Sequence, residues 1–393
     1  MTPPREQLRR ELNQVAGQPV PVLERTAPQA EPGTAVLWRE GDRVLGLLTR
    51  SCALRALPPC MLAWPDLQIL DACDNQLTQL PDALAELTAL RQLRVDRNAL
   101  TALPSGIATM PQLAELHADH NALATLPEGL GRAPALRRVS AYGNRLTALP
   151  ESLEDLGELR ELSVGGNQLT VAPPELPQLR QLEVLNLAEN TLTTTPDLRP
   201  LTQLQMLDLA HNPLAAVPES IGTLPCLRVL YLSDSGLRHL PAAIAMLAAL
   251  EYLNVGENAL TELPDDLAGL RALRELRVGH NRLQRLPTSV GALTELRELH
   301  ARNNELAALP TSLGALPNLT HLDLRNNRLT ALPDELGALR ELAQLDLRNN
   351  PLVSLPESLG ALPKLRKLDL RWTKLPRAPW WSELEARGCA VLT

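Results

Sequence analysis

The chain has 393 residues, of which 89 are leucine and none is phenylalanine. Its 45% content of hydrophobic residues is too high for a disordered protein, and no apolar run reaches the roughly 20 residues of a membrane-spanning helix. The net charge of -7 argues against a general nucleic-acid binder, because such proteins carry excess Lys and Arg for the phosphates. A core built almost only from leucine indicates that spaces of one shape recur along the chain, so the composition predicts a repeat protein.

Residues 1–43 are predicted to form a cap at the start of the repeats. Residues 4–16 carry Leu8, Leu12 and Val15 at helical spacing. A proline-rich link follows, and residues 36–44 are predicted to form a hairpin that leads into the first strand. The N-terminal segment is charged where a signal peptide needs an apolar stretch. We therefore expect a cytoplasmic protein, with export as an effector through a non-cleaved signal left open.

A 23-residue period extends from residue 44 to residue 376 and is marked by one recurring polar residue, here called the anchor. The anchor is Ser235 in one turn, and the period reaches Cys52 at one end and Thr373 at the other, which gives fifteen turns. In all other turns the anchor is asparagine: Asn75, Asn98, Asn121, Asn144, Asn167, Asn190, Asn212, Asn258, Asn281, Asn304, Asn327 and Asn350.

Each turn reads roughly LxxLxLxxNxLxxLPxxLgxLxx, as in residues 319–333 and beyond. The LxLxx segment predicts a short strand, and adjacent turns should stack these strands about 4.8 Å apart in a parallel sheet. The asparagine can both donate and accept, so it can satisfy backbone groups left unpaired by a buried turn. The PxxLGxL segment predicts a short helical turn on the outer side. One turn, after Asn190, is a residue short and has Thr195 in place of leucine, which predicts a lost outer helix there.

These motifs resemble the leucine-rich repeat family, and the Leu-Pro step is similar to the 23-residue subtype of Ras-group intracellular scaffolds and bacterial effectors. The resemblance covers residues 44–376. It implies an α/β fold, a right-handed solenoid shaped like a horseshoe. A parallel β-sheet would line the concave face, and short helical turns and loops the convex face. It also implies a protein-binding scaffold, which we expect to be a monomer.

Residues 377–393 are predicted to cap the other end. Ser382 is a candidate helix N-cap, Gly388 a candidate helix stop, and residues 389–392 should close the stack. The five tryptophans lie near the two ends of the chain, and we interpret them as cap residues rather than ligand contacts. They are Trp38, Trp64, Trp372, Trp380 and Trp381.

The sequence contains no recognisable catalytic motif. Cys73-Asp74 is a Cys-Asp pair, but it lacks a general base held near the thiol. His117, Asp119 and His120 are residue types that can bind a metal ion, although a solvated polar face explains them better. The five cysteines are scattered and include no CxxC pair. We therefore predict no enzyme activity, no cofactor and no metal site.

Non-consensus residues two, four and six positions before each anchor should face the concave surface. All three tyrosines and six of the seven histidines lie at these positions or beside them. Apolar and aromatic residues gather in the central turns, where water is otherwise expected, and such patches usually mark binding sites. In the last turns, columns of arginine and aspartate lie side by side. These charges either pair with one another or await a carboxylate or phosphate from a partner.

We predict a non-enzymatic protein–protein interaction scaffold that binds a protein partner through its concave face, with no nucleic-acid or membrane partner. The predicted contact residues are Tyr142, Val184, Met206, Asp208, Val229, Tyr231, Tyr252, Arg277, His300, Arg302, Arg325 and Arg348. Two alternatives stay open. The first is a bacterial effector or signalling component that acts on a host or kinase partner. The second is a module that binds a carbohydrate or phosphorylated ligand through tyrosine and arginine.

Overall fold

A computed structural model describes residues 4–27, 29, 31–195 and 197–393. The chain divides into two compact units, Met1–Thr191 and Leu192–Thr393, and each is described here by itself. The division falls in the shortened turn after Asn190. The domain boundaries at 43/44 and 376/377 stay a prediction. Within the described residues, no helix is both long enough and apolar enough to cross a membrane.

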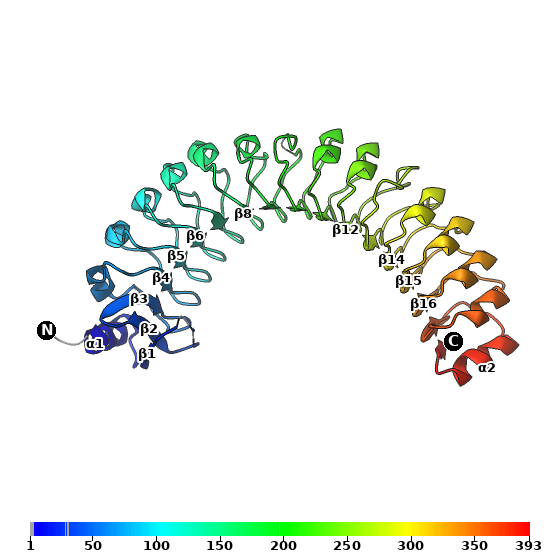
Figure 1. The fold of residues 1–393 in the computed structure, drawn as a ribbon, viewed down its shortest axis with the longest axis horizontal. Coiled ribbons are helices and arrows are strands. Elements are labelled where there is room, and N and C mark those ends of the chain that lie inside the picture. The colour runs from blue at the N-terminus through cyan, green and yellow to red at the C-terminus, as the bar shows by residue number, and fades with distance from the viewer. Residues whose placement is uncertain (1–3, 28, 30, 196) are drawn as a thin grey trace. The chain divides into compact units, whose positions relative to one another are not determined.

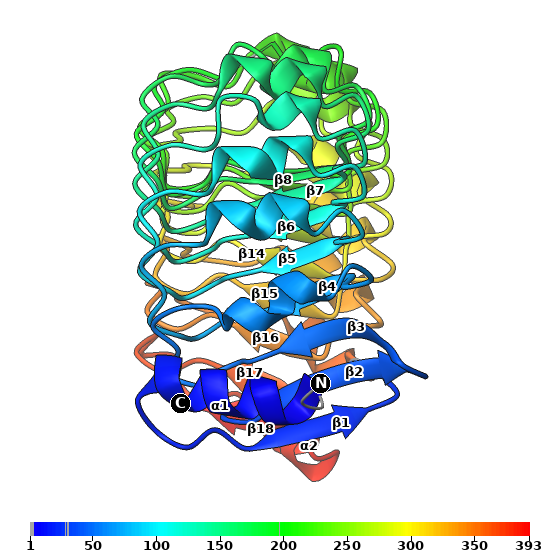
Figure 2. The ribbon, with the colours of Figure 1, turned by 90° about the vertical axis from the view of Figure 1, so that its left-hand side faces the viewer.

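The first unit begins with the predicted helix and hairpin. Helix α1 (Pro4–Ala16) buries Leu8 and Leu12 completely. Strand β1 (Val22–Arg25) runs parallel to β2 (Ala35–Glu40), which pairs antiparallel with β3 (Arg43–Leu48). Figure 2 shows these elements together at the end of the unit. Strand β3 then pairs with β4 in parallel and starts the stack of repeats.

Six parallel strands continue the first unit, and each strand residue pairs with the residue 23 positions later, as Leu70 does with Leu93. The strands are β4 (Ile69–Asp71), β5 (Gln92–Arg94), β6 (Glu115–His117), β7 (Arg138–Ser140), β8 (Glu161–Ser163) and β9 (Val184–Asn186). The 3-10 helices are η1 (Pro59–Ala63), η2 (Asp82–Glu86), η3 (Ser105–Thr109), η4 (Leu130–Arg132), η5 (Glu151–Asp155) and η6 (Leu176–Gln178). The strands lie on the inner side of the unit and the helical turns on the outer side (Figure 1).

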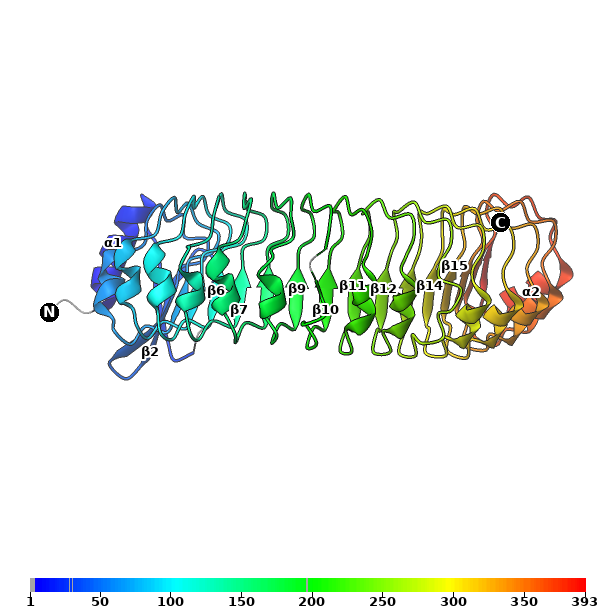
Figure 3. The same ribbon diagram turned by 90° about the horizontal axis from the view of Figure 1, so that it is seen from above.

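The second unit repeats this arrangement, with its turns following one another in a row (Figure 3). Its strands are β10 (Met206–Asp208), β11 (Val229–Tyr231), β12 (Tyr252–Asn254), β13 (Glu275–Arg277), β14 (Glu298–His300), β15 (His321–Asp323), β16 (Gln344–Asp346), β17 (Lys367–Asp369) and β18 (Ala390–Leu392). Its helices are η7 (Glu219–Thr223), η8 (Ala242–Met246), η9 (Thr288–Ala292), η10 (Thr311–Ala315), η11 (Asp334–Ala338), η12 (Glu357–Ala361) and α2 (Pro379–Ala386). The predicted class, a parallel sheet with short helical turns opposite it, is confirmed in each unit.

Two return segments of the second unit depart from the pattern. The described residues between 192 and 205 contain no 3-10 helix, as the missing residue predicts. The segment between β12 and β13 also lacks one, which the sequence analysis did not anticipate. There the Asp266 carboxylate accepts the Ala268 N–H at 2.9 Å. A local side-chain bond of this kind competes with helix formation.

The anchor asparagines tie successive turns together through the backbone. The Oδ1 of Asn281 accepts the N–H of Leu260 at 3.0 Å, and its Nδ2 donates to the carbonyl of Val255 at 3.0 Å, both in the preceding turn. The same Nδ2 also lies 3.1 Å from the carbonyl of Val278 in its own turn. Asn281 is only 8% exposed. These bonds satisfy buried backbone groups that water cannot reach, so the predicted role of the asparagine is confirmed.

The substituted anchors keep only part of this bonding. The Ser235 hydroxyl donates to the Leu209 carbonyl of the preceding turn at 3.4 Å. The N–H of Leu214 donates instead to the carbonyl of Asn212, at 2.7 Å. The Thr373 hydroxyl bonds within its own turn. Ser235 therefore keeps the donor bond to the preceding turn, whereas Thr373 keeps only the donor bond within its own turn.

The C-terminal end differs from the prediction in two respects. Helix α2 begins at Pro379 rather than after Ser382, because proline fits the first helical turn, where its missing N–H would be unpaired anyway. The helix ends as expected before Gly388, whose φ is +88°, and β18 pairs with β17 to close the stack. Trp381 is buried and serves as a cap, but Trp372 is 68% exposed, so its interpretation as a cap residue is wrong.

We expect Asn281→Ala to destabilise the second unit by about 1–3 kcal/mol, because it leaves the Leu260 N–H buried without a partner and removes one of the two amide donors to the Val255 carbonyl. Asn281→Ser should cost less, because Ser235 shows that a serine retains the donor bond. Denaturant unfolding gives the free energies, and hydrogen exchange at the Leu260 amide reports the local loss. An unchanged exchange rate at Leu260 in the alanine variant would contradict this role.

Candidate functional site

The exposed side chains of the sheet form one regular surface in each unit, here called the sheet face. In most strands the middle residue is buried, and its two neighbours, six and four positions before the anchor, are half-buried. The residue two before the anchor adjoins them. The residue one before the anchor bends the chain with a left-handed backbone, as at His280, where φ is 58°. The period-two exposure predicted from LxLxx is therefore present.

The charges on the sheet face of the first unit are largely satisfied by neighbours in adjacent turns. Arg138 donates from Nη2 to Glu161 at 2.6 Å and lies 3.5 Å from Glu115. The Asp119 carboxylate accepts the Ser140 hydroxyl at 2.6 Å and the Tyr142 N–H at 2.7 Å. This surface resembles a network of paired charges more than a site that awaits a ligand.

Tyr142 and the predicted metal-ligand candidates also find partners inside the first unit. The Tyr142 hydroxyl donates to Glu189 at 2.6 Å, and its ring meets the His120 ring edge-on with centroids 5.4 Å apart. His117 instead lies 3.5 Å from Glu115. His117, Asp119 and His120 therefore contact different neighbours and do not converge on one point.

Four of the predicted apolar residues meet on the sheet face of the second unit. Met206 pairs in register with Val229, and Val229 pairs with Tyr252. The rings of Tyr231 and Tyr252 lie 5.0 Å apart between centroids, tilted by 47°. We call these four residues the tyrosine patch. All four are half-buried, and burial raises the pKa of the Tyr252 hydroxyl. The fifth, Val184, belongs to β9 of the first unit.

A hollow of about 130 Å³ adjoins the patch because three turns carry small residues two positions before the anchor. These residues are Ser233, Gly256 and Gly279. A Cβ atom at Gly279 would lie 3.1 Å from the Cγ of Arg302, closer than most contacts allow. The remaining lining residues are His211, Asn254, Glu257, Arg277, His280, His300 and Arg302.

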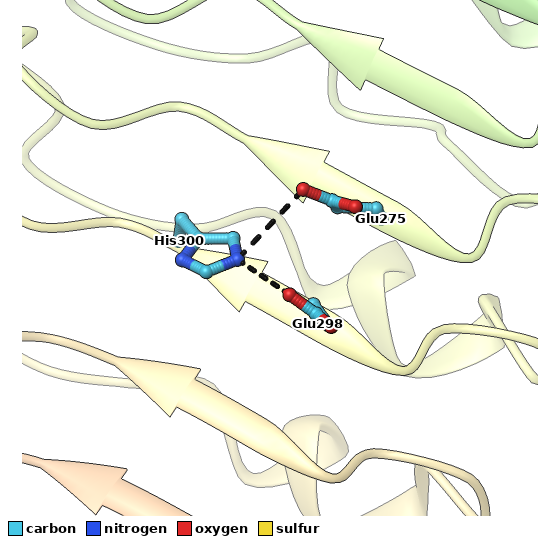
Figure 4. Close-up of side chains that lie close together, drawn as sticks. All are labelled: Glu275, Glu298 and His300. Atoms are coloured by element: carbon cyan, nitrogen blue, oxygen red, sulfur yellow. Dashed lines mark hydrogen bonds and ion pairs between the residues drawn. The ribbon is translucent and has the colours of Figure 1, made fainter.

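Two glutamates and a histidine converge beside this hollow (Figure 4). The Nε2 of His300 lies 3.0 Å from Glu298 and 3.9 Å from Glu275. Within the described part of the chain, this is the one trio whose potential ligand atoms lie within 4.8 Å of one another. Arg277 also donates to Glu275, so a cation at this point would compete with a guanidinium for the carboxylate. Arg277 and His300 are among the contact residues predicted from the sequence, whereas the two glutamates are not.

The arginine and aspartate columns of the last turns are partly self-paired. Arg348 forms a bidentate pair with Asp346, at 2.9 Å from Nε and 2.6 Å from Nη2. Arg371 pairs with the fully buried Asp369 at 2.9 and 2.8 Å. Burial acts to raise the pKa of Asp369, but the hydrogen bonds from Arg371 and the charge of Arg348 outweigh it and hold the pKa below its ordinary value.

The pairing weakens toward the middle of the unit. The Nε of Arg325 lies 3.5 Å from Asp323. Burial raises the pKa of Asp323, although Arg325 opposes that effect. Arg302 has no ion pair with any residue that the structure describes. Its turn carries His300 where the following turns carry aspartate.

The Cys73 thiol is not an activated nucleophile. Cys73 is buried, and its sulfur donates to the Asp96 carboxylate at 3.3 Å. Burial raises its pKa strongly, and the negative charges of Asp71 and Asp96 raise it further. A thiol of this kind stays protonated at neutral pH, which opposes nucleophilic chemistry.

Comparison with known proteins identifies similar sequences and folds. A family described as "Leucine-rich repeat region" matches residues 166–308, and one described as "Leucine rich repeat" matches residues 294–352 and 317–375. A leucine-rich repeat protein of Leptospira interrogans is 32% identical, with 87% of this chain and 94% of that chain covered and a TM-score of 0.79. No curated protein matches.

Two receptor structures are also similar. The ectodomain of the Arabidopsis receptor kinase HAESA, in complex with an IDA peptide hormone, is 27% identical over 86% of this chain and 63% of that chain, with a TM-score of 0.63. Drosophila Toll, in complex with Spatzle, is 23% identical over 86% of this chain and 48% of that chain, with a TM-score of 0.73. The likeness to Toll concerns the fold alone.

We expect the native protein to resist thiol alkylation at Cys73 at pH 8, because the raised pKa leaves almost no thiolate and burial blocks access. Half-exposed Cys226 should react first. Peptide mapping by mass spectrometry after brief iodoacetamide treatment gives the order, and a denatured sample provides the control. Preferential labelling of Cys73 would contradict the structural reading of this residue.

Proposed function

Because the chain belongs to the leucine-rich repeat family, we propose that it is a non-enzymatic recognition module that binds a protein partner through its sheet face. The observation that carries this proposal is the tyrosine patch. Tyr231 and Tyr252 pack against each other on the solvent side of a sheet whose other outward positions are mostly polar. Tyrosine is among the residues most enriched at binding hot spots.

The patch suits binding because its support is rigid. Each strand beneath it is held to its neighbours by backbone ladders and anchor side chains, as Asn258 does by bonding to Leu237 and Leu232. A binding surface that is already ordered loses little conformational entropy when a partner docks. Aromatic side chains with few rotatable bonds add to this advantage.

Charged residues flank the patch on the same unit. Asp208 pairs in register with Tyr231 on one side, and Arg277 pairs with Asn254 on the other. His300 follows in the next strand, in register with Arg277. An acidic group on one side and a mixed cluster of Arg277 and His300 with their paired glutamates on the other would orient a partner more than they would add affinity.

The similar HAESA ectodomain supports the class of ligand but not its identity, because its structure contains a peptide hormone. For this chain, the proposal rests on its own exposed residues.

We expect the double change Tyr231→Ala and Tyr252→Ala to weaken partner binding by about 2 kcal/mol or more, because it removes two aromatic contacts at the centre of the patch. The partner is first captured from the native cell with the wild-type protein, and affinities are then measured by calorimetry. Met246→Ala is the matched control, because Met246 is an exposed apolar residue on η8, away from the sheet face. Wild-type affinity in the folded double variant would disprove the role of the patch.

A further inference from the structure

A second groove lies on the second unit, beyond the tyrosine patch. It encloses about 330 Å³ and extends across the turns anchored by Asn281 to Thr373. Arginine side chains, exposed amides and one indole line it. The lining residues are His280, Arg302, Asn303, Arg325, Asn326, Arg348 and Trp372. Its chemistry therefore differs from that of the patch, since it is basic at one end and aromatic at the other.

Arg302 supplies an uncompensated cation at the first end. Arg325 and Arg348, in the next two turns, each have an aspartate two residues earlier, whereas Arg302 has His300 there. That histidine is already bonded to Glu298 at 3.0 Å. The Arg302 stem lies close to Gly279, where an added Cβ would be only 3.1 Å from the Arg302 Cγ. The guanidinium is thus positioned but unpaired among the described residues, and its fork suits a carboxylate.

Trp372 supplies an exposed apolar surface at the other end. It is 68% exposed, and its backbone is left-handed, with φ of 65°. The equivalent residues of the three preceding turns are Asn303, Asn326 and Asn349, a residue type that tolerates this conformation. Other bulky residues share this conformation at the same position, as Arg97 and His280 do, so it is the exposure of the indole that sets Trp372 apart. The cap does not require this indole, because Trp380 and Trp381 already close the stack. The Trp372 ring instead lies beside the Arg371 guanidinium, 5.7 Å from the ring centroid.

The amides between these two ends form a fixed edge. Asn349 donates to Asn326 at 3.0 Å, Asn326 donates to Asn303, and the Asn303 amide contacts the His280 ring. An amide nitrogen carries two N–H groups, and each of these bonds uses one. The second N–H of Asn326, which lines the groove, can donate to the backbone carbonyl of an extended chain lying there.

We propose that this groove binds an extended peptide segment that carries a carboxylate side chain and, four residues away, a large apolar side chain. The carboxylate pairs with Arg302 and the apolar side chain packs on Trp372. These residues are three turns apart, about 14 Å at 4.8 Å per strand, which an extended chain covers in about four residues. Residues i and i+4 of a strand also face the same side.

A single-stranded nucleic acid would also use arginine and an aromatic ring, but the charge distribution favours a peptide. Asp323, Asp346 and Asp369 neutralise the arginines of their own turns. A strand of phosphates needs a continuous basic track, whereas the described groove offers one unpaired guanidinium. The inference depends on the proposed function only in taking a protein segment as the ligand.

The test uses fluorescein-labelled eight-residue peptides and the full chain, measured by fluorescence anisotropy. The probe peptide carries Glu and Phe four residues apart in an otherwise Ser/Thr background. Control peptides replace Glu by Gln, or place Glu and Phe three residues apart. We expect both controls to bind at least about tenfold more weakly, because the charged hydrogen bond or the aromatic contact is lost. A labelled oligo-dT of equal length tests the nucleic-acid alternative.

Arg302→Gln and Trp372→Asn should each weaken binding of the probe peptide at least about tenfold. Trp372→Asn restores the residue type of the preceding turns, so folding should be retained, and thermal melting checks it. Arg282→Gln is the matched charge control, because Arg282 is exposed outside the groove. Equal binding by the groove variants and the wild type, equal binding of the Gln peptide, or tighter Arg302-dependent binding of oligo-dT would each overturn the proposal.

The double tyrosine variant separates this inference from the proposed function. It should bind the probe peptide as the wild type does, because the patch lies outside the groove. Loss of peptide binding in that variant, with Arg302→Gln unchanged, would place the peptide on the patch and disprove the groove. Conversely, a tyrosine variant that keeps native-partner affinity disproves the patch but leaves the peptide result intact.

Discussion

The buried anchor asparagine is the interaction on which each unit depends. Its amide bonds to backbone groups of its own turn and of the turn before it, as Asn304 does with Ala301, Val278 and Leu283. This requirement fixes how each turn is aligned on the turn before it, because a misaligned turn would leave buried backbone groups unpaired. Even the turn that is one residue short keeps the bond, from the Leu192 N–H to Asn212. Strands of three residues can then form a stable stack, because buried leucines and anchor side chains both hold neighbouring turns together. Many exposed positions of the sheet face can consequently vary without loss of the fold.

That freedom explains why the binding capacity is concentrated in a few places. On the first unit, arginines, glutamates and Asp119 satisfy one another across adjacent turns. On the second unit, two positions break this self-sufficiency: Arg302 lacks an acidic partner among the described residues, and Trp372 exposes its indole. The tyrosine patch adds an apolar surface beside turns that carry small residues two positions before the anchor. Affinity should therefore come from a few residues, while the paired charges exclude unsuitable partners.

The repeat pattern made most of the fold predictable, because it repeats a local signal many times. The leucine spacing predicted which strand residues are buried. The donor and acceptor groups of asparagine predicted that it bonds to the backbone of neighbouring turns. The same pattern indicated the tyrosine patch, since the position relative to the anchor determines the face of the sheet. What it could not indicate depends on side-chain partners in other turns. Glu275 pairs with both Arg277 and His300, and Arg302 has no carboxylate beside it in the described part of the chain. Both features depend on how side chains of neighbouring strands lie against one another, which the repeat pattern does not encode. Trp372 was misread because proximity to the chain end suggested a cap.

Hydroxyl-radical footprinting of the complex with its native partner tests the central claim, that recognition occurs on the sheet face, most directly. Two methionines of the second unit provide an internal comparison, because Met206 lies on β10 in the tyrosine patch and Met246 lies exposed on η8. The account predicts that the partner protects Met206, Tyr231 and Tyr252 from oxidation and leaves Met246 as reactive as in the free protein. Protection of Met246 with an unchanged sheet face would contradict it.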